Sequence, residues 1–334
     1  MFCERGGFYI DPLKPVERAV ITHAHSDHAR PGHDHYLCSA VNVPLLRARL
    51  GSEISIESLN YGENKKIGEV EVSFFPAGHV LGSAQIRLEY KGEVWVVSGD
   101  YKRQNDPSCE NFELVKCNTF ITECSFGIPV YQWPAPEQEI EALMNWWQDN
   151  SKNGKTSVLF VYALGKAQRI LSSLPEGAGP IGYHGSITRM LNAYKDHGIH
   201  FPLAAPITQD NRKKFQNKGL VLAPMSTQNS AWLKKFQPYS LAQASGWSLI
   251  RGNRRRQAVD QGFVISDHVD WPALLQTIKG TSADNIGLTH GQTDILKKWL
   301  IESGDYKVFT FSNHFAKYRD YDHEVTEKGM TSHA

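Results

Sequence analysis

The chain has 334 residues, with 36 basic and 35 acidic side chains and a formal net charge of +1. Apolar residues make up 41% of the sequence and charged residues 21%, which is enough to bury a core and excludes global disorder. The near-zero net charge excludes a protein that binds nucleic acid or membranes by overall charge, so such a role would need a local patch. The length predicts two domains, or one large domain with an insertion.

The compartment follows from the cysteines and from the absence of long apolar runs. The five cysteines are odd in number and form no CxxC pair, which is typical of the reducing cytoplasm and excludes a disulfide framework. No apolar run approaches the ~18–20 residues of a membrane span. The first residues lack a basic segment followed by an apolar one, so we expect no secretory signal. We therefore predict a cytoplasmic protein without a membrane partner.

Short apolar or alternating runs predict strands in the first part of the chain. They lie at 18–22, 70–75, 85–90, 94–97 and 119–122. Two of them, 70–75 and 85–90, alternate apolar and polar residues as half-exposed strands do, while the others are the apolar runs of buried strands. Pro136 then begins a helix, because apolar residues follow it at helical spacing as far as Trp147.

The remainder of the chain continues the alternation of strand and helix, with a change of character in the middle. We predict strands at 158–162, 220–223, 263–266, 286–289 and 308–311 and helices at 166–174, 272–278 and 294–302. Between 175 and 245 the strands are short and separated by turns rich in proline and glycine. The sequence therefore predicts an α/β protein that leaves one domain, builds a smaller one and returns to the first.

Five histidines fall within thirteen residues: His23, His25, His28, His33 and His35. The first three belong to His-Ala-His-Ser-Asp-His, directly after a buried strand, where α/β proteins place sites. His23 and His25 can point the same way, while Asp27 and His28 can reach a second ion. A solvated polar loop is the alternative interpretation. His33 and His35 follow Pro31-Gly32, and we predict that both lie on the surface.

Two further strand ends supply residues that could bind a metal. His79 lies in Gly-His-Val-Leu-Gly-Ser, and Asp100 ends Ser-Gly-Asp after the run 94–97. A carboxylate at the second position can bridge two cations. Taken alone, His79 could be a hydrogen-bonded turn residue and Asp100 a cap. Three such motifs in one chain favour a metal site.

The order HxHxDH, GHxxGS and SGD resembles the metallo-β-lactamase fold, and later residues resemble its β-CASP branch of nucleases. Residues 122–127 resemble acidic motif A of that branch, 266–268 motif B and 289–291 motif C. Residues 162–168 resemble the start of the β-CASP insertion and 245–247 its end. Asp11 matches an aspartate that orients the metal-binding loop, the alternative being a plain turn residue before Pro12. The matches span 11–291 in the family's order.

The resemblance implies an αββα metallo-β-lactamase sandwich with a smaller inserted α/β domain, the β-CASP domain. It would divide the chain into 1–165, 166–245 and 246–334. Two divalent metal ions are implied, with Zn²⁺ expected first and Mn²⁺ or Fe²⁺ as alternatives. The implied metal-binding residues are His23, His25, Asp27, His28, His79, Asp100 and His290. Asp27, Glu123 and His268 would be catalytic, with Glu123 supporting His268 beside the scissile phosphate.

The substrate class depends on finer likenesses. A histidine at motif C is typical of RNA-processing members and of bacterial DNA exonucleases associated with ligases. The short chain and its 245–271 region most resemble the DNA enzymes, which implies 5′→3′ degradation of a DNA strand from an end and partnership with a ligase and a helicase. Residues Arg251, Arg254, Arg255 and Arg256 could contact phosphates, or form a solvated turn. Trp247 and Trp271 are the candidates for stacking on bases.

Three alternatives remain open. An RNA-processing β-CASP nuclease would use the same site on a different substrate. A small-molecule hydrolase is disfavoured because a small substrate needs no second domain over the site. A non-catalytic scaffold is disfavoured because every metal-binding position is filled.

Overall fold

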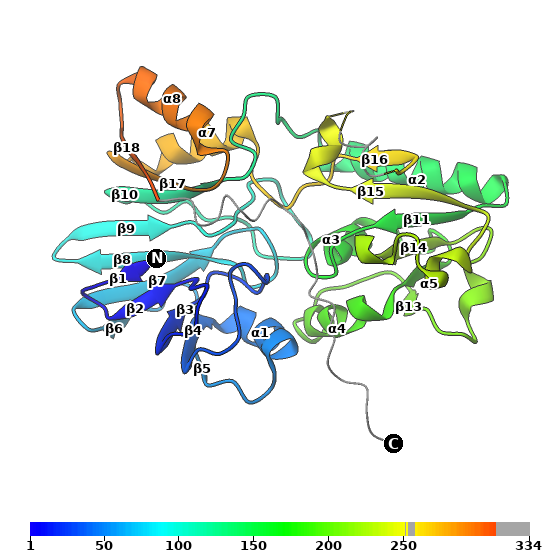
Figure 1. The fold of residues 1–334 in the computed structure, drawn as a ribbon, viewed down its shortest axis with the longest axis horizontal. Helices are drawn as coiled ribbons and strands as arrows, with labels where there is room; N and C mark the ends of the chain where they lie inside the picture. The colour runs from blue at the N-terminus through cyan, green and yellow to red at the C-terminus, as the bar shows by residue number, and fades with distance from the viewer. Residues whose placement is uncertain (251, 253–257, 312–334) are drawn as a thin grey trace.

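The computed structural model describes residues 1–250, 252 and 258–311. It is a mixed α/β protein with three β-sheets, of five, seven and six strands. Figure 1 shows two lobes side by side. We call the part with the five- and seven-stranded sheets the first lobe, and the part with the six-stranded sheet the second lobe. Within the described residues, no helix is both long enough and apolar enough to cross a membrane.

The five-stranded sheet is formed by the N-terminal residues. Its strands follow one another in chain order: β1 (Phe2–Cys3), β2 (Phe8–Ile10), β3 (Arg18–Val20), β4 (His35–Ser39) and β5 (Ile56–Leu59). Only β1 and β2 pair antiparallel, and the other neighbours are parallel. The carboxyl ends of β3 and β4 therefore lie at one edge of this sheet.

The seven-stranded sheet joins segments from both halves of the chain. Its order is β18 (Lys307–Thr310), β17 (Asn285–Gly291), β10 (Thr119–Cys124), β9 (Glu93–Val97), β8 (Ala84–Tyr90), β7 (Val70–Pro76) and β6 (Lys65–Ile67). Strands β6 to β9 pair antiparallel, and β9, β10, β17 and β18 pair parallel. Apolar side chains from this sheet and from the five-stranded sheet, such as Val20, Leu37, Phe74 and Ile86, form one buried cluster.

The six-stranded sheet is parallel throughout. Its order is β13 (Ala204–Pro206), β12 (Ile181–Tyr183), β14 (Leu220–Ala223), β11 (Thr156–Phe160), β15 (Tyr239–Ala244) and β16 (Gln261–Phe263). Parallel sheets are covered on both faces, which explains why every residue of β11 is buried. Strands β11 and β16 lie outside the predicted insertion of 166–245, so the sheet takes up more of the chain than that range.

Helices cover the sheets of both lobes. They are α1 (Val43–Leu50), α2 (Pro136–Lys152), α3 (Lys166–Ser173), α4 (Thr188–Asp196), α5 (Ala231–Lys234), α7 (Trp271–Thr281) and α8 (Thr293–Ser303). Pro136 occupies the first turn of α2, where its missing N–H costs nothing, and Glu137 and Glu139 lie in the same turn. Buried Leu274 and Leu296 place α7 and α8 against the seven-stranded sheet.

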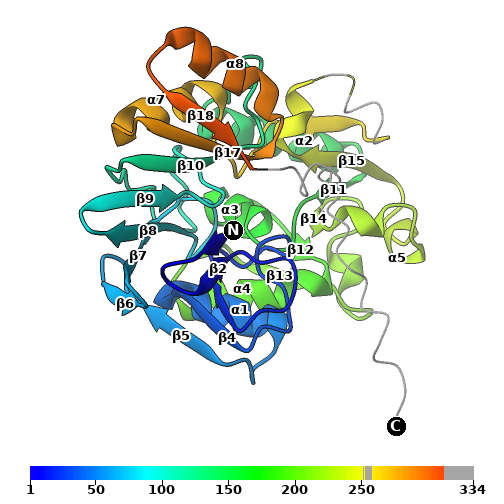
Figure 2. The ribbon, with the colours of Figure 1, turned by 60° about the vertical axis from the view of Figure 1, so that its left-hand side comes forward.

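The lobes contact each other through helices as well as through the connecting chain. Arg189 Nη1 of α4 donates to the carbonyl of Ala48 in α1 at 2.8 Å. The Leu81 N–H donates to the hydroxyl of Tyr194 in α4 at 3.1 Å. Figure 2 shows α1 and α4 next to each other, as Figure 1 does. These contacts fix the second lobe against α1 and the loop that follows β7.

Most predicted elements are confirmed, with one shift that matters for the site. The structure has strands at or within a few residues of every predicted run, and α2 begins at Pro136 as predicted. The strand predicted at 263–266 instead ends at Phe263. Beyond it, the Val264 N–H donates to the Glu139 side chain, and the Ser266 carbonyl accepts from Lys102 and Arg169. Among the residues that the structure describes, these main-chain groups therefore make no hydrogen bonds to a neighbouring strand.

Candidate metal centre

The HxHxDH motif forms a tight turn directly after β3. The N–H groups of His28 and Ala29 both donate to the carbonyl of His25, at 3.2 and 2.8 Å. Arg49 Nη1 of α1 donates to the carbonyls of Ala24 and Ala29 from outside the turn. The turn is therefore fixed by main-chain bonds, and its side chains can face the strand ends of the neighbouring sheet.

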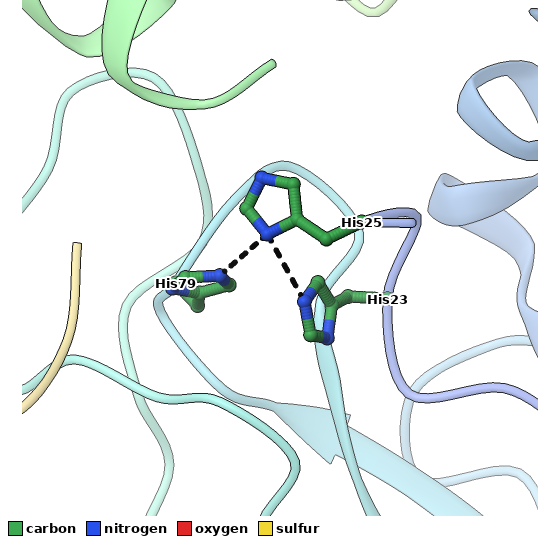
Figure 3. A group of neighbouring side chains, drawn as sticks. All are labelled: His23, His25 and His79. Carbon is green, nitrogen blue, oxygen red and sulfur yellow. Dashed lines mark hydrogen bonds between the residues drawn. The ribbon is translucent and has the colours of Figure 1, made fainter. Parts of the chain in front are cut away.

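Three imidazoles converge on one point. His25 Nδ1 lies 3.1 Å from His23 Nε2 and 3.0 Å from His79 Nε2. Figure 3 shows this group, with His25 between the other two rings. His79 follows β7, so the group unites the two sheets of the first lobe. His23 and His79 are fully buried and His25 is partly buried.

Hydrogen bonds on the far side of each ring assign its tautomer. His25 Nε2 lies 3.2 Å from the carbonyl of Leu164, and His79 Nδ1 lies 2.7 Å from the carbonyl of Asp267. A carbonyl only accepts, so these nitrogens carry the protons. His23 Nδ1 lies 3.1 Å from the Thr22 hydroxyl, which itself donates to Asp11, so this nitrogen is also protonated. The three facing nitrogens therefore present lone pairs to one another.

Asp100 lies between this group and the residues predicted to bind a second ion. Its Oδ2 lies 3.3 Å from His28 Nε2, 3.7 Å from His23 Nε2 and 3.9 Å from His79 Nε2. Gly99 permits this approach: its φ is +57°, and a Cβ there would lie 2.7 Å from Thr22 Cβ. Asp100 Oδ1 is buried and has no hydrogen-bond partner in the described part of the chain.

Asp27 and His290 flank His28. Asp27 Oδ2 lies 3.6 Å from His28 Nε2, and the His290 ring stacks on the His28 ring at 4.9 Å between centroids. His290 comes from the end of β17, with a φ of +51°. All seven predicted metal-binding residues thus lie in one cluster, although Asp27 is half exposed.

The protonation of the cluster indicates a place for positive charge. Burial lowers the pKa of His23, His25 and His290, and burial with the neighbouring His268 and His25 lowers the pKa of His79 to about 3. For His28, burial is outweighed by Asp100, Asp27 and Asp11, which raise its pKa well above the ordinary value. Without another cation, a proton on His28 balances these carboxylates. A bound metal ion would replace that proton.

The residues fit a metal ion on geometry as well as charge. Three facing lone pairs repel one another unless a cation lies between them. Around a tetrahedral ion with Zn–N distances of ~2.0–2.1 Å, neighbouring nitrogens are about 3.3 Å apart, close to the observed 3.0 and 3.1 Å. The unpartnered Asp100 Oδ1 supplies a further acceptor. The chain therefore has a donor set suited to a borderline divalent metal.

Asp11 connects the hydrogen bonds behind the cluster. One carboxylate accepts from the Thr22 N–H at 2.9 Å, the Thr22 hydroxyl at 2.6 Å and His28 Nδ1 at 2.8 Å. It thereby fixes the tautomer of His28 directly and of His23 through Thr22. Carboxylates behind metal-binding histidines act in this way. The predicted orienting residue lies where that role requires.

Glu123 and His268 form a pair beside the metal-binding group. Glu123 is fully buried, and its Oε2 lies 2.8 Å from His268 Nδ1. The His268 ring lies 4.9 Å from the His79 ring, between centroids. One nitrogen or oxygen from each of His79, Asp100 and His268 lies within 4.8 Å of the others, so His268 is also close enough to bind metal.

The residues predicted to contact nucleic acid lie in different environments, and some of them lie outside the described residues. Arg251, Arg254, Arg255 and Arg256 lie outside the described residues. Trp247 is half-buried, with its ring 4.7 Å from Phe126, which lies 5.9 Å from the His268 ring. Trp271 is 7% exposed and packs in the core of the first lobe, so a stacking role for it was wrong.

The surface prediction for the two later histidines is confirmed for His35 and wrong for His33. His33 is buried, because its Nδ1 accepts from the Val16 N–H at 3.2 Å and its ring packs on Tyr36. Sequence reasoning also missed a group of buried charges next to the centre: Lys102, Lys166, Arg169, Asp106 and Asp267. The segment 166–174 also contains Gln168, Ser172 and Ser173, so no local pattern marked Lys166 and Arg169 as buried.

The chain is similar to several proteins whose names refer to DNA or RNA enzymes. No protein-family model matches the chain. The chain is 30% identical over 301 residues to a protein of Opitutus terrae named "Probable DNA ligase", covering 89% of this chain and 29% of that protein. It is 26% identical over 331 residues to Endoribonuclease YSH1 of Saccharomyces cerevisiae, covering 81% of this chain and 41% of the relative. It is 28% identical over 181 residues to an RNase J-like protein of Methanocaldococcus jannaschii, covering 47% and 43%.

The chain belongs to the β-CASP branch of the metallo-β-lactamase fold. It spans less than half the length of each of these three relatives. A solved structure of a protein of unknown function from Enterococcus faecalis shares the fold, with a TM-score of 0.62 at 11% identity over 87% of this chain and 78% of that one. The names of these relatives refer to both DNA and RNA enzymes, so the names leave the substrate of this chain open.

Proposed function

We propose that this β-CASP protein is a metal-dependent phosphodiesterase that degrades DNA from an end, as a 5′→3′ single-strand exonuclease in DNA repair. The observation that supports this most is the paired arrangement of the site. Three imidazole nitrogens face one another at 3.0–3.1 Å, Asp100 joins them to His28, and a Glu123–His268 pair lies at the edge. A metal site can activate water and a neighbouring histidine can donate a proton to the leaving group, and both contributions suit phosphodiester hydrolysis.

The residues would divide the work as follows. His23, His25 and His79 would hold one divalent ion, Zn²⁺ first, and Asp27, His28 and His290 a second, with Asp100 shared. Two such ions polarise a phosphodiester and lower the pKa of bound water from 15.7 towards ~7. His268 would hold a proton on the nitrogen that faces away from Glu123 and donate it to the departing 3′-oxygen. Glu123 would keep that imidazole oriented and Asp11 would orient His28.

We also propose the finer architecture that the family implies. The five- and seven-stranded sheets, with α1, α7 and α8 outside, would be the αββα sandwich, and the inserted β-CASP domain would be the smaller unit near 166–245. The flanking parts 1–165 and 246–334 would form the sandwich, apart from β11 and β16, which pair in the six-stranded sheet. We propose a cytoplasmic enzyme that works with a ligase and a helicase. The similarity to part of a protein named "Probable DNA ligase" supports the first of these partners.

The test uses purified protein loaded with Zn²⁺ or Mn²⁺ and single strands of DNA and RNA of the same sequence. We expect the DNA to be shortened progressively from its 5′ end, so that a 5′ label is released early and a 3′ label late. Asp27→Ala protein is the control for contaminating nucleases. Equal or faster digestion of the RNA would overturn the substrate proposal and favour an RNA-processing enzyme. Cleavage of circular single-stranded DNA would overturn the requirement for an end.

The arginine run allows a separate test of the contact surface. Removing one arginine that binds a phosphate should reduce the slope of log affinity against log salt by about 1. We expect Arg254→Ala or Arg255→Ala to flatten the salt dependence of DNA binding, while Lys152→Ala on α2 should leave it unchanged. Slopes equal to that of the wild type in Arg254→Ala, Arg255→Ala and Lys152→Ala would mean that these arginines do not contact the DNA phosphates.

A further inference from the structure

A cluster of buried basic side chains lies between the lobes, beside the metal-binding group. Lys102, Lys166 and Arg169 are 1%, 3% and 5% exposed. Lys102 comes from the first lobe, after β9, and the other two come from one face of α3 in the second lobe, three residues apart. We call these three residues the buried basic cluster. Charges so deeply buried require close partners.

Most of the partners of the cluster lie on one short segment, at Ser266 and Asp267. Lys102 Nζ and Arg169 Nη1 both donate to the carbonyl of Ser266. Lys166 Nζ lies 3.3 Å from Asp267 Oδ2, and Arg169 Nη1 lies 3.6 Å from Asp267 Oδ1. Arg169 Nε also lies 3.6 Å from Asp106 Oδ2.

The segment held in this way supports two functional side chains. The main-chain carbonyl of Asp267 accepts from His79 Nδ1 at 2.7 Å, which turns His79 Nε2 towards His25 and His23. The next residue is His268, which pairs with Glu123. A displacement of residues 266–268 would therefore move the imidazoles of His79 and His268 together.

The start of α3 also contacts the opposite side of the metal-binding group. The carbonyl of Leu164 accepts from His25 Nε2 at 3.2 Å. Gly165 follows with a φ of +89°, and a Cβ there would lie 2.4 Å from Val80 Cγ1, next to His79. Residues 164–169 thus touch His25 directly and reach His79 through Asp267.

We propose that Lys166 and Arg169 are positioning residues for the metal centre: they fix the Asp267 carbonyl, and through it the direction and tautomer of His79. The inference rests on the proposed function, because it takes the three imidazoles as a metal site. Hydrogen-bond partners behind metal-binding histidines commonly change metal affinity or activity by about 10–100-fold. Here the partner is a carbonyl, so its position depends on the charges that hold the segment.

The experiment compares Zn²⁺ affinity, measured by competition with a chelator, with thermal unfolding in the same full-length variants. Lys166→Met and Arg169→Met should weaken Zn²⁺ binding about 10–100-fold, and Arg169→Lys should restore part of it. Leu233→Ala is the stability control, since Leu233 is buried in the second lobe away from this segment. It should lower the unfolding temperature and leave Zn²⁺ affinity unchanged. Lys195→Met, at an exposed position of α4, should change neither quantity.

A double variant guards against misfolding. Lys166→Met leaves Asp267 with one cation fewer, whereas Lys166→Met with Asp267→Asn removes both charges and leaves the Asp267 carbonyl in the chain. The double variant should fold and should still bind Zn²⁺ more weakly than the wild type does. Unchanged affinity in this folded variant, or an equal loss in Leu233→Ala, would overturn the inference.

The outcomes for the two proposals are separable. If the wild type binds Zn²⁺ and degrades DNA but the basic-cluster variants bind Zn²⁺ normally, only the positioning role is overturned. If the wild type binds Zn²⁺ and the variants bind it weakly, yet no nucleic acid is cleaved, the positioning role stands and the proposed function fails. If the wild type binds no metal, both fail.

Discussion

The two lobes contribute to the metal centre in different ways. Every side chain predicted to bind metal comes from the first lobe, on turns that follow β3, β7 and β9 and at the end of β17. In the described part of the second lobe, the contributions are a main-chain carbonyl at Leu164 and the cations Lys166 and Arg169. The first lobe thus supplies the metal-binding atoms, and the second supplies groups that fix their directions. The geometry of the site depends on the contact between the lobes as well as on the motif sequences.

The largest effect should come from removing metal-binding side chains of the first lobe. Asp27→Ala and His79→Ala should abolish cleavage while leaving a folded protein, because losing metal catalysis removes several kcal/mol of barrier lowering, or about 10³-fold or more in rate. Metal content and rate should be measured on the same samples. Asp149→Ala on the exposed surface of α2 should match the wild type. Retained cleavage in metal-analysed Asp27→Ala protein would contradict the two-metal interpretation.

His268 lies on the chain that connects the lobes, and its substitution separates chemistry from metal binding. His268→Ala should keep two metal ions per chain and near-normal DNA binding, with turnover reduced about 10²–10⁴-fold through loss of a proton donor. A substrate with a better leaving group should recover part of the rate. A fall to one ion or none would make His268 a metal-binding residue and remove the role proposed for it.

A smaller effect should follow from altering the contact between the lobes at Gly165. Gly165→Ala adds a methyl group 2.4 Å from Val80 Cγ1 in a left-handed backbone, and we expect a loss of about 2–3 kcal/mol of unfolding free energy with weaker metal binding. Gly177→Ala is the matched control, because its φ is +73° and nothing lies within 4 Å of the added Cβ. It should cost about 1–2 kcal/mol without affecting metal. Equal results for the two variants would mean that the contact with Val80 does not matter.

The smallest expected effect concerns an indole that supports His268. Trp133 Nε1 donates to the His268 carbonyl at 2.9 Å. Trp133→Phe keeps the packing on Phe126 but loses that bond, which should cost about 0.5–1.5 kcal/mol, seen as a turnover reduced up to tenfold with unchanged metal content. Trp95→Phe removes a surface bond to Glu93 and should leave turnover unchanged. A loss of metal in Trp133→Phe would contradict this division.

Local motifs explain why much of the site could be predicted from the sequence. His23 and His25 follow a buried strand at alternate positions, and Asp100 ends another, so their juxtaposition requires only that strand ends meet. Asp11 needed the family resemblance, because a single aspartate before a proline has many explanations. Its three hydrogen bonds to Thr22 and His28 are visible only in the folded chain.

The parts that could not be predicted depend on contacts between distant segments. Lys166 and Asp267 are far apart in the sequence, and neither has a local pattern that indicates a buried pair. The burial of His33 depends on the main chain at Val16 and on the ring of Tyr36. The strand predicted at 263–266 has an apolar sequence, but cations from two other segments take up the Ser266 carbonyl. In each case a contact between distant segments decides the outcome, and the local sequence does not show that contact.

The pairing of β10 with β17 has a consequence for synthesis on the ribosome. Thr119 of β10 pairs with Asn285 of β17, so all of the second lobe is translated before β10 receives this neighbour. A nascent chain leaves the ribosome with its N-terminus first, and its domains tend to fold as they emerge. While α2 to β16 appear, β10 keeps one unpaired edge, the kind of edge on which strands of other chains can add. His290 ends β17, so a nascent chain can gather every other predicted metal-binding residue and still lack the last one until β17 has left the exit tunnel.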